Sequence, residues 1–347
     1  MPVQARRVFR LSGVMALSLA LSYAMQMDLP FIAPIFALLL TAAPGPPKGL
    51  KALVGLSLVL AVTLGVGLLL VPLLLNYPVT AIVIAGAGIY FSNYLSVNLG
   101  KGAVGALLTA GVTLISAAGT LSFPLAVTVI EALVLGVGVA IISQWIVYPW
   151  FPENESFAPP APPAVTPSGS NWIALRATLV VLPAYLLALT NPAMYLPIIM
   201  KSVSLGQQSS LVDARDAGRV LLGSTFLGGC FAVVFWFALG VATNLWTFTL
   251  LMLLVGVYFS GKLYQVIPTK LPAAFWQNVV VTMLILLGSA VQDSDSGKDV
   301  YEAFAVRMGL FVAVTCYAWF AIELLELLRS RRLARFGDAL SLEGGRG

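Results

Sequence analysis

The strongest constraint on the fold of this chain is a series of long apolar runs separated by short polar turns. Hydrophobic residues make up 59% of its 347 residues and charged residues only 10%, whereas a soluble domain carries about 25% charged residues. A helix needs about 20 apolar residues to cross the hydrocarbon core of a bilayer. In lipid, backbone polar groups must be satisfied within the protein, and a helix does this within one segment. The sequence therefore predicts an all-α integral membrane protein.

Twelve apolar segments can be distinguished, six on each side of a Pro-rich stretch. The second, fifth and eighth are short, and the eighth contains Pro192 and Pro197. The segments are Leu11–Met25, Pro30–Ala43, Leu50–Leu75, Val79–Val97, Ala103–Ala118, Phe123–Val147, Trp172–Leu189, Pro192–Leu205, Val220–Ala242, Leu245–Leu263, Leu271–Ala290 and Tyr301–Leu328. We therefore expect about 12 transmembrane helices.

A short motif occurs twice in the chain at a fixed offset. Residues 88–95 read GIYFSNYL, and residues 256–263, 168 positions later, read GVYFSGKL. The same offset relates Lys51 to Arg219, and each has a Gly four residues on. Two matches at one offset indicate a duplicated unit, and an even number of spans gives both units one orientation. The predicted parts are two parallel six-helix repeats at 1–150 and 172–328, a Pro-rich cytoplasmic linker at 151–171 and a basic cytoplasmic tail at 329–347.

Positive charge is distributed unevenly across this topology. With both termini in the cytoplasm, nearly all of the 19 Lys and Arg residues lie on the cytoplasmic side. Only Lys298 lies outside, in an expected acidic loop that also holds Asp293, Asp295 and Asp299. Cytoplasmic loops of membrane proteins carry such an excess of Lys and Arg. The asymmetry supports the predicted orientation. It also accounts for the net charge of +5 without a nucleic-acid partner.

The sequence lacks the usual signatures of an enzyme. There is no histidine, so the commonest general base and zinc ligand are missing. No GxxxxGK[ST] phosphate loop, GxSxG elbow or HExxH helix is present. The two cysteines, Cys230 and Cys316, have no ligand-like residues spaced around them. We expect no enzymatic activity, no cofactor and no metal.

Two carboxylates are candidates for proton coupling. Glu131 lies nine residues after Ser122 in an apolar run, which places it near the bilayer midplane at 1.5 Å per residue. Ionisable groups at that depth often mark a transport path or a proton relay. The alternative is a protonated Glu131 bonded to a neighbouring helix. Asp28, at a turn shortly before Pro34, either participates in charge binding or caps a helix.

Four cations are candidates for an anion path. Arg307, in the last span, either faces a central cavity as an anion contact or extends to the interface. Lys201, in the short eighth segment, has the same two alternatives. Lys51 and Arg219 lie at the inner ends of duplicated helices, where they fix topology or draw anions toward an inner mouth.

The duplicated motif places an aromatic pair in each half of the chain. Tyr90 and Phe91 correspond to Tyr258 and Phe259. These rings either line a path and stack on an aromatic ligand, or pack between helices, as such residues commonly do.

A family resemblance rests on these features. Lys51-Ala-Leu-Val-Gly55 and Arg219-Val-Leu-Leu-Gly223 each follow a proline-bearing short span, and Arg307 lies in the last span. The pattern resembles the fusaric acid resistance or aromatic acid exporter superfamily, and covers nearly the whole chain. Larger members carry cytoplasmic domains after each six-span unit, in whose places this chain has only the linker and the tail. It is therefore similar to the short bacterial branch.

The resemblance implies a function that the residues alone do not specify. It implies an exporter in the bacterial inner membrane, driven by protons, for small aromatic or amphipathic organic anions. It also implies a periplasmic adaptor of the membrane-fusion type as a partner, and self-association into a homo-oligomer is compatible with it. Two alternatives are a passive organic-anion channel and a membrane scaffold for the adaptor.

Overall fold

The chain folds into a bundle of helices in the computed structural model, which describes residues 2–153, 167–192, 195, 198–199, 201–203, 214–297 and 299–344. The described residues form no strand. Within the same residues, nine helical stretches are long and apolar enough to cross a membrane. The prediction of an all-helical chain with membrane-spanning helices is confirmed for this part of the protein.

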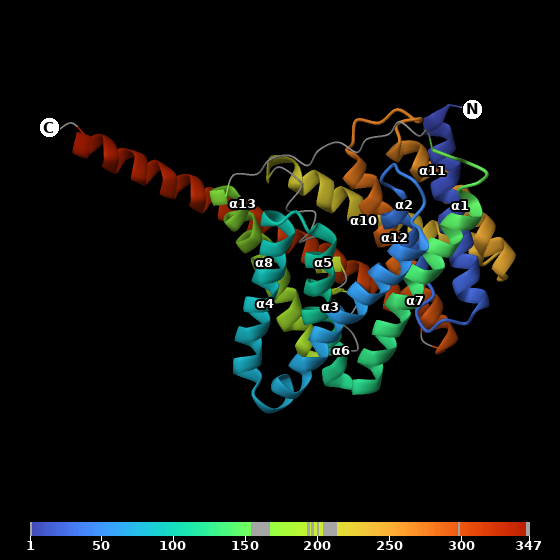
Figure 1. Cartoon of the computed structure of the whole chain (residues 1–347), viewed down its shortest axis with the longest axis horizontal. Coiled ribbons are helices and arrows are strands. Elements are labelled where there is room, and N and C mark those ends of the chain that lie inside the picture. Colours follow the sequence, from blue (N-terminus) through green and yellow to red (C-terminus); the bar gives the residue numbers. More distant parts are fainter. Residues whose placement is uncertain are drawn as a thin grey trace.

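The first half of the chain contributes a run of helices joined by short turns (Figure 1). They are α1 (Val3–Ala24), α2 (Ile32–Thr41), α3 (Leu50–Asn76), α4 (Pro78–Asn98), α5 (Gly102–Ala110), the π-helical turn η1 (Gly111–Ile115), α6 (Ser116–Leu121) and α7 (Phe123–Val147). The short second segment is confirmed as the ten-residue α2. It is less than the length needed to cross a bilayer on its own.

The second half contributes long helices over its described residues. They are α8 (Pro167–Thr190), α10 (Ala214–Leu239), α11 (Leu245–Leu263), α12 (Ala273–Asp295) and α13 (Val300–Gly344). Of the short eighth segment, the structure describes positions 192, 195, 198–199 and 201–203.

Polar residues at the turns explain where several helices begin. The Ser122 hydroxyl accepts a hydrogen bond from the Leu125 amide at 3.2 Å and caps α7. Asn244 caps α11 in the same way through the Thr247 amide, at 2.7 Å. Pro78 stands in the first turn of α4, where its missing N–H costs no helical hydrogen bond. These turns divide the apolar sequence into separate helices.

Two predicted boundaries are corrected by the structure. The fifth segment, expected to be short, is a continuous helical stretch through α5, η1 and α6, and its residues 104–121 are long enough to span. Helix α12 extends past Ala290 to Asp295, so Asp293 lies in its last turns rather than in a loop. The predicted tail at 329–347 is helical as far as Gly344, as a continuation of α13. At the two corrected boundaries, small or polar residues continue the helix beyond the apolar run.

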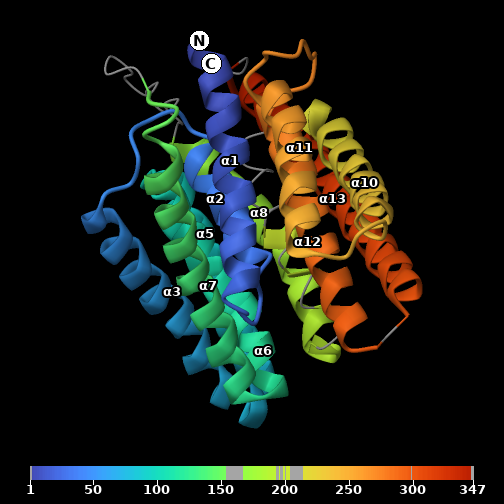
Figure 2. The same ribbon diagram turned by 90° about the vertical axis from the view of Figure 1, so that its right-hand side faces the viewer.

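The two halves exchange their first helices. Helix α1 packs along α11, and α8 packs along α4 (Figures 1 and 2). Gly256 of the repeated motif allows the first of these contacts, because a Cβ there would lie 3.1 Å from Cβ of Ser12. Two apolar core clusters result, and each contains residues from both halves of the chain.

The ends of the helices gather on two opposite sides of the bundle. Tyr264, just after α11, donates a hydrogen bond to the Ala42 carbonyl at 3.0 Å, and Trp145 near the end of α7 donates to the Lys48 carbonyl at 2.5 Å. The start of α1 lies on the same side (Figure 2), which we call the basic end because Arg6, Arg7, Arg10, Lys48 and Lys262 lie there. At the opposite end, Gln292 of α12 donates to the Asp28 carbonyl at 3.0 Å.

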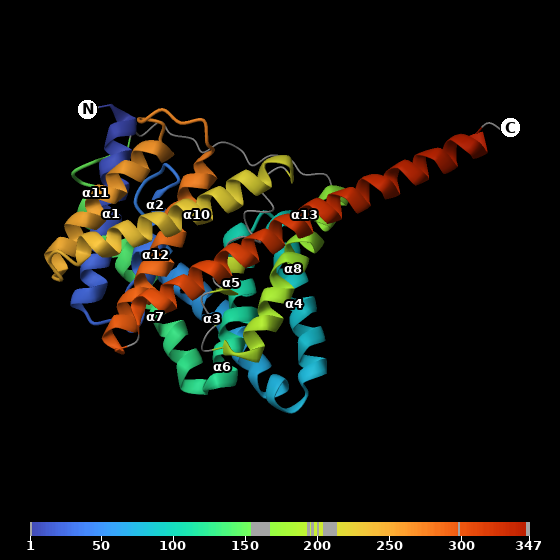
Figure 3. The ribbon, with the colours of Figure 1, turned by 180° about the vertical axis from the view of Figure 1, so that it is seen from behind.

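Helix α13 crosses the back of the bundle. It packs against α10 and α8, and Figure 3 shows it running between them before it projects beyond the other helices. Many large apolar side chains on α3, α10 and α13 face outward. An outward apolar surface on helices of this length matches a lipid environment.

Candidate functional site

A fully buried lysine is the most unusual polar feature of the bundle. Lys201 has no exposed surface, although ionisable side chains at membrane depth are costly. Its Nζ donates hydrogen bonds to Oδ1 of Asn278 at 3.0 Å and to Oγ1 of Thr282 at 2.7 Å. Both acceptors lie on α12, four residues apart, and therefore on one face of that helix.

The hydrogen bonds continue from α12 to α10. Nδ2 of Asn278 donates to Oγ of Ser224 at 2.5 Å, and Ser224 donates in turn to the Val220 carbonyl of its own helix. Gly228 allows the two helices to approach closely, because a Cβ there would lie 2.7 Å from the Val279 carbonyl oxygen. The close approach brings Ser224 within reach of Asn278. We call Lys201, Asn278, Thr282 and Ser224 the lysine cluster.

The lysine cluster contains no carboxylate. The ion pairs among the described residues join Arg7 and Arg10 to Glu153, Arg176 to Glu326, and Arg307 to Asp293. None of them includes Lys201. A buried cation without a counter-ion is costly unless it is neutralised or paired. The cluster is therefore suited to bind an anion or to exchange a proton.

The segment that carries Lys201 lies between the two apolar cores. Ile198 belongs to the core that contains most of the second half, whereas Ile199 and Val203 belong to the other. Val203 also lines a cavity of about 350 Å³ whose other walls are apolar residues of α2, α3, α5, η1 and α7. Lys201 and the cavity thus lie on different faces of one short segment.

Arg307, the other cation predicted in a span, has a carboxylate partner. Its guanidinium makes two hydrogen bonds to Asp293 of α12, of which the one from Nη2 to Oδ1 measures 3.1 Å. Asp293 is buried and Arg307 is partly buried. The role of Arg307 as a substrate contact stays a prediction, and any substrate anion would compete with Asp293 for it.

The two carboxylates predicted to couple protons lie apart from the lysine cluster. The Glu131 side chain is exposed on α7, on the side of the helix away from the residues that face the core. Asp28 is exposed in the turn after α1, where its carbonyl accepts the bond from Gln292. The proton-coupling role of both stays a prediction. The helical register explains the position of Glu131, because its neighbours Val129 and Ala132 are buried.

The remaining predicted path residues are spread over the bundle. Lys51 is exposed in the first turn of α3, and Arg219 lies in α10, where the structure describes its backbone only. Tyr90 lies beside Tyr94 on α4, with ring centroids 6.5 Å apart, and Phe91 is exposed.

The aromatic pair of the second half makes its ring contacts within that half. Phe259 is buried, with its ring centroid 4.8 Å from that of Phe231 and 6.1 Å from that of Trp276. Tyr258 is partly exposed and stacks on Phe231 at 6.0 Å. The ring contacts of the described residues do not join the two aromatic pairs. Their role in a substrate path stays a prediction.

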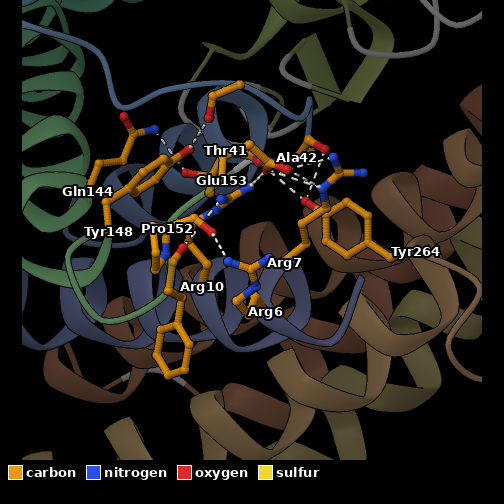
Figure 4. Close-up of polar contacts among 12 residues, drawn as sticks. Arg6, Arg7, Arg10, Thr41, Ala42, Gln144, Tyr148, Pro152, Glu153 and Tyr264 are labelled. Carbon is orange, nitrogen blue, oxygen red and sulfur yellow. Dashed lines mark hydrogen bonds and ion pairs between the residues drawn. The ribbon is translucent and has the colours of Figure 1, made fainter. Parts of the chain in front are cut away.

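A second polar cluster, at the basic end, ties the start of α1 to the residues after α7 (Figure 4). Glu153 accepts hydrogen bonds from Arg7 and Arg10, each with a shortest distance of 2.6 Å. Arg10 is fully buried, and its guanidinium carbon lies 4.5 Å from the ring centroid of Tyr148. Burial opposes ionisation of Glu153, but the two arginines outweigh it and hold its pKa below the ordinary value of 4.5.

Replacing Glu153 with Gln is expected to lower the free energy of unfolding by on the order of 3 kcal/mol, because Arg10 would remain buried without a carboxylate. Thermal unfolding of the purified protein in detergent measures this. The depressed pKa means that the stabilisation is present above pH 4.5 and is lost as the pH falls through the folded value. The variant should lack that acid dependence.

The matched control for this change is the double variant Arg10→Met with Glu153→Gln. It leaves no unpaired charge at the position, so most of the lost stability should return. Equal stability of Glu153→Gln and the parent protein would show that the cluster does not hold α1 in place.

The sequence indicated that Lys201 is a candidate site residue, but it did not indicate which side chains bond to it. Asn278 and Thr282 are two polar side chains four positions apart in an apolar run, a spacing that places them on one face of a helix. This spacing could have identified Asn278 and Thr282 as a polar pair on one helix face. The pairing of Arg10 with Glu153 joins positions more than 140 residues apart, and no local pattern indicates it. The described residues contain no group of His, Cys, Asp or Glu arranged to hold a metal ion.

Comparison with known proteins gives one match. No curated protein and no solved structure matches the chain. The match covers residues 7–147, which run from the start of α1 to the end of α7. This first half of the chain is similar to the family described as "Protein of unknown function (DUF2955)".

Proposed function

We propose that this protein carries small organic anions across a membrane and that Lys201 provides the central positive charge. The observation that carries the proposal is a fully buried lysine, bonded only to neutral side chains among the described residues, in a bundle of helices long enough to span a bilayer. A lasting unpaired charge at such a position would be costly. An anionic substrate provides the missing counter-ion.

The duplicated architecture supports a carrier. We propose that the chain consists of two parallel six-span repeats, residues 1–150 and 172–328, with the 151–171 linker and the 329–347 tail outside the membrane. The exchange of α1 and α8 between the halves supports this, because corresponding helices make corresponding contacts. Many carriers place their substrate site between two such repeats. The Lys201 segment contributes residues to both apolar cores, each of which joins the two halves of the chain.

The distribution of charge supports an orientation. Arg6, Arg7, Arg10 and Lys48 lie at the basic end, whereas Asp28 and Asp293 lie at the other. Positive charge marks the cytoplasmic side of a membrane protein. We therefore propose that both termini are cytoplasmic, in the inner membrane of a bacterium. The family resemblance, rather than the structure, motivates export, proton drive and a periplasmic adaptor of the membrane-fusion type.

The apolar cavity supports an amphipathic substrate. Its volume of about 350 Å³ lies at the lower end of the range for small-molecule sites. Its walls offer contact to an aromatic ring or a branched apolar group, and Lys201 lies two residues from the cavity-lining Val203, on the other face of the same segment. A passive organic-anion channel fits the same features, and dependence of the flux on protons separates it from a carrier. A scaffold for the adaptor would retain its role after loss of Lys201.

Efflux from intact bacterial cells tests the proposed function. Cells that make the protein and cells with an empty vector are loaded with a labelled aromatic carboxylate or with its uncharged amide. The protein should accelerate efflux of the carboxylate severalfold and leave that of the amide unchanged. Equal efflux from both kinds of cell, with the protein present in the membrane fraction, would refute the proposal. Acceleration of both compounds would refute the role of the charge.

A further inference from the structure

We propose that Lys201 binds one proton together with each organic anion, so that the empty site holds a neutral amine and the loaded site an ammonium ion. This inference rests on the proposed function and deepens it, because it specifies how protons and the substrate are linked. The geometry of the lysine cluster carries it.

The hydrogen bonds of the lysine cluster fit an amine. The Thr282 hydroxyl donates its own proton to the backbone carbonyl of Asn278 at 2.7 Å, so its oxygen is the acceptor in the bond with Lys201. The side-chain nitrogen Nδ2 of Asn278 donates to Ser224, so the side-chain oxygen Oδ1 is the acceptor in the other bond with Lys201. Among the described residues, Nζ therefore has two acceptors. A neutral amine has two N–H groups and is satisfied, whereas an ammonium ion has a third.

The surroundings of Lys201 also hold no counter-ion for an ammonium group. The partners of Nζ among the described residues are neutral side chains, and none of the ion pairs of those residues includes Lys201, so an amine is favoured in the empty site. On the helices that pack against α12, the acidic groups are paired or lie elsewhere: Asp293 pairs with Arg307, and Glu326 pairs with Arg176. The other charged groups of these elements and of α12 and α8 are Lys262, Asp295, Glu302, Glu323, Arg329 and the undescribed side chains of Arg215, Asp216, Arg219, Arg331, Arg332, Arg335, Asp338 and Glu343.

Binding of an anion reverses this preference. A carboxylate near Nζ accepts the third N–H and supplies the counter-ion, which stabilises the ammonium form. By linkage, a bound proton raises the affinity for the anion and a bound anion raises the affinity for the proton by the same factor. In the pH range in which Lys201 of the empty site is unprotonated, each further pH unit should lower the affinity for the anion about tenfold.

This linkage differs from the expectation based on Glu131. One proton and one monovalent anion move together, so the step carries no net charge and does not respond to membrane potential. An acid transported in this way leaves the cell down its own concentration gradient. Proton-driven export, in contrast, would require the proton and the anion to occupy the site alternately.

Nuclear magnetic resonance of the lysine side chain tests the inference directly. The whole protein is labelled with ¹³C,¹⁵N-lysine and placed in lipid nanodiscs at pH 8, and its Nζ signals are recorded with and without an aromatic carboxylate. Lys201→Met identifies the signal by its loss. The expected result is an amine signal in the empty protein and an ammonium signal after the carboxylate is added.

The outcomes separate this inference from the proposed function. An ammonium signal in both states would overturn the coupled proton and leave anion transport intact. An amine signal that does not change with a carboxylate that the protein demonstrably transports would also overturn it. If no aromatic carboxylate binds at any pH, the proposed function fails together with the linkage, and the signal of the empty protein still reports which form the cluster stabilises.

Lys201→Arg provides the matched variant, because arginine keeps the cation and does not lose its proton. Calorimetry of carboxylate binding in two buffers with different ionisation enthalpies counts the protons taken up. The parent protein should take up close to one proton per anion at pH 8. Lys201→Arg should bind with no proton uptake and without pH dependence. If the larger side chain prevents folding, the proton count of the parent protein decides the question alone, and a count of zero contradicts the proposal.

Discussion

Replacing Lys201 with Met is expected to reduce efflux of an aromatic carboxylate to the rate of cells with an empty vector while the protein remains folded. Methionine fills a similar volume and removes the charge that the substrate requires. Replacing a buried charge by an apolar side chain is often neutral for stability. The loss of the hydrogen bonds to Asn278 and Thr282 should cost about 2 kcal/mol. Efflux from loaded cells, normalised to protein in the membrane fraction, measures the effect.

The matched control is Lys101→Met. Lys101 is exposed just before α5, so its removal changes the net charge by the same amount without changing the lysine cluster. Its efflux rate should stay within a factor of about two of the parent. Normal efflux by Lys201→Met would show that the buried lysine is structural. Equal losses in both variants would indicate an effect of total charge rather than of the site.

Gly67→Ala is expected to destabilise the first half of the chain more than alanine at either of the other glycines of α3, Gly55 and Gly65. A Cβ at Gly67 would overlap the Gly111 carbonyl group and lie 2.9 Å from Cβ of Ile115, where η1 crosses α3. A Cβ at Gly111 would likewise overlap the Thr63 carbonyl oxygen of α3. Because the obstacle is backbone rather than a flexible side chain, the two helices must separate, at a cost of about 3 kcal/mol or more.

Gly65→Ala supplies the control for this change. It lies two residues away in the same helix, and a Cβ there would meet no atom within 4 Å. Alanine favours a helix over glycine by about 1 kcal/mol, so this variant should be as stable as the parent or more so. Thermal unfolding and size-exclusion profiles compare the two. Similar profiles for Gly67→Ala and Gly65→Ala would show that α3 and η1 do not pack closely.

The sequence predicted where helices lie along the chain better than it predicted which helices pack against each other. The length of the apolar runs and the short polar turns between them predicted most of the helices, including the short α2, because these features act locally. Boundaries failed where a helix continued through polar residues. Asp293 was expected in a loop, yet its pairing with Arg307 allows it to lie inside α12. Such a pairing depends on the next helix and has no local signal.

The candidate site could be predicted only in part. Lys201 stood out because a charge in an apolar run is rare. Its environment depended on which helices pack together, and the close approach of α10 and α12 at Gly228 could not be deduced from either run alone. The face on which Glu131 lies was also undetermined, because the runs are apolar on all sides and leave the orientation of a helix about its axis unspecified.

Flux through the purified protein in liposomes tests the central claim most directly. The unmodified chain is reconstituted into lipid vesicles after size exclusion confirms that it is folded, and uptake of a labelled aromatic carboxylate is followed over time. The predicted result is a saturable flux that exceeds that of protein-free vesicles, with no such excess for the uncharged amide. A carboxylate flux equal to that of protein-free vesicles, across a series of aromatic and amphipathic acids, would contradict the claim that this protein transports organic anions.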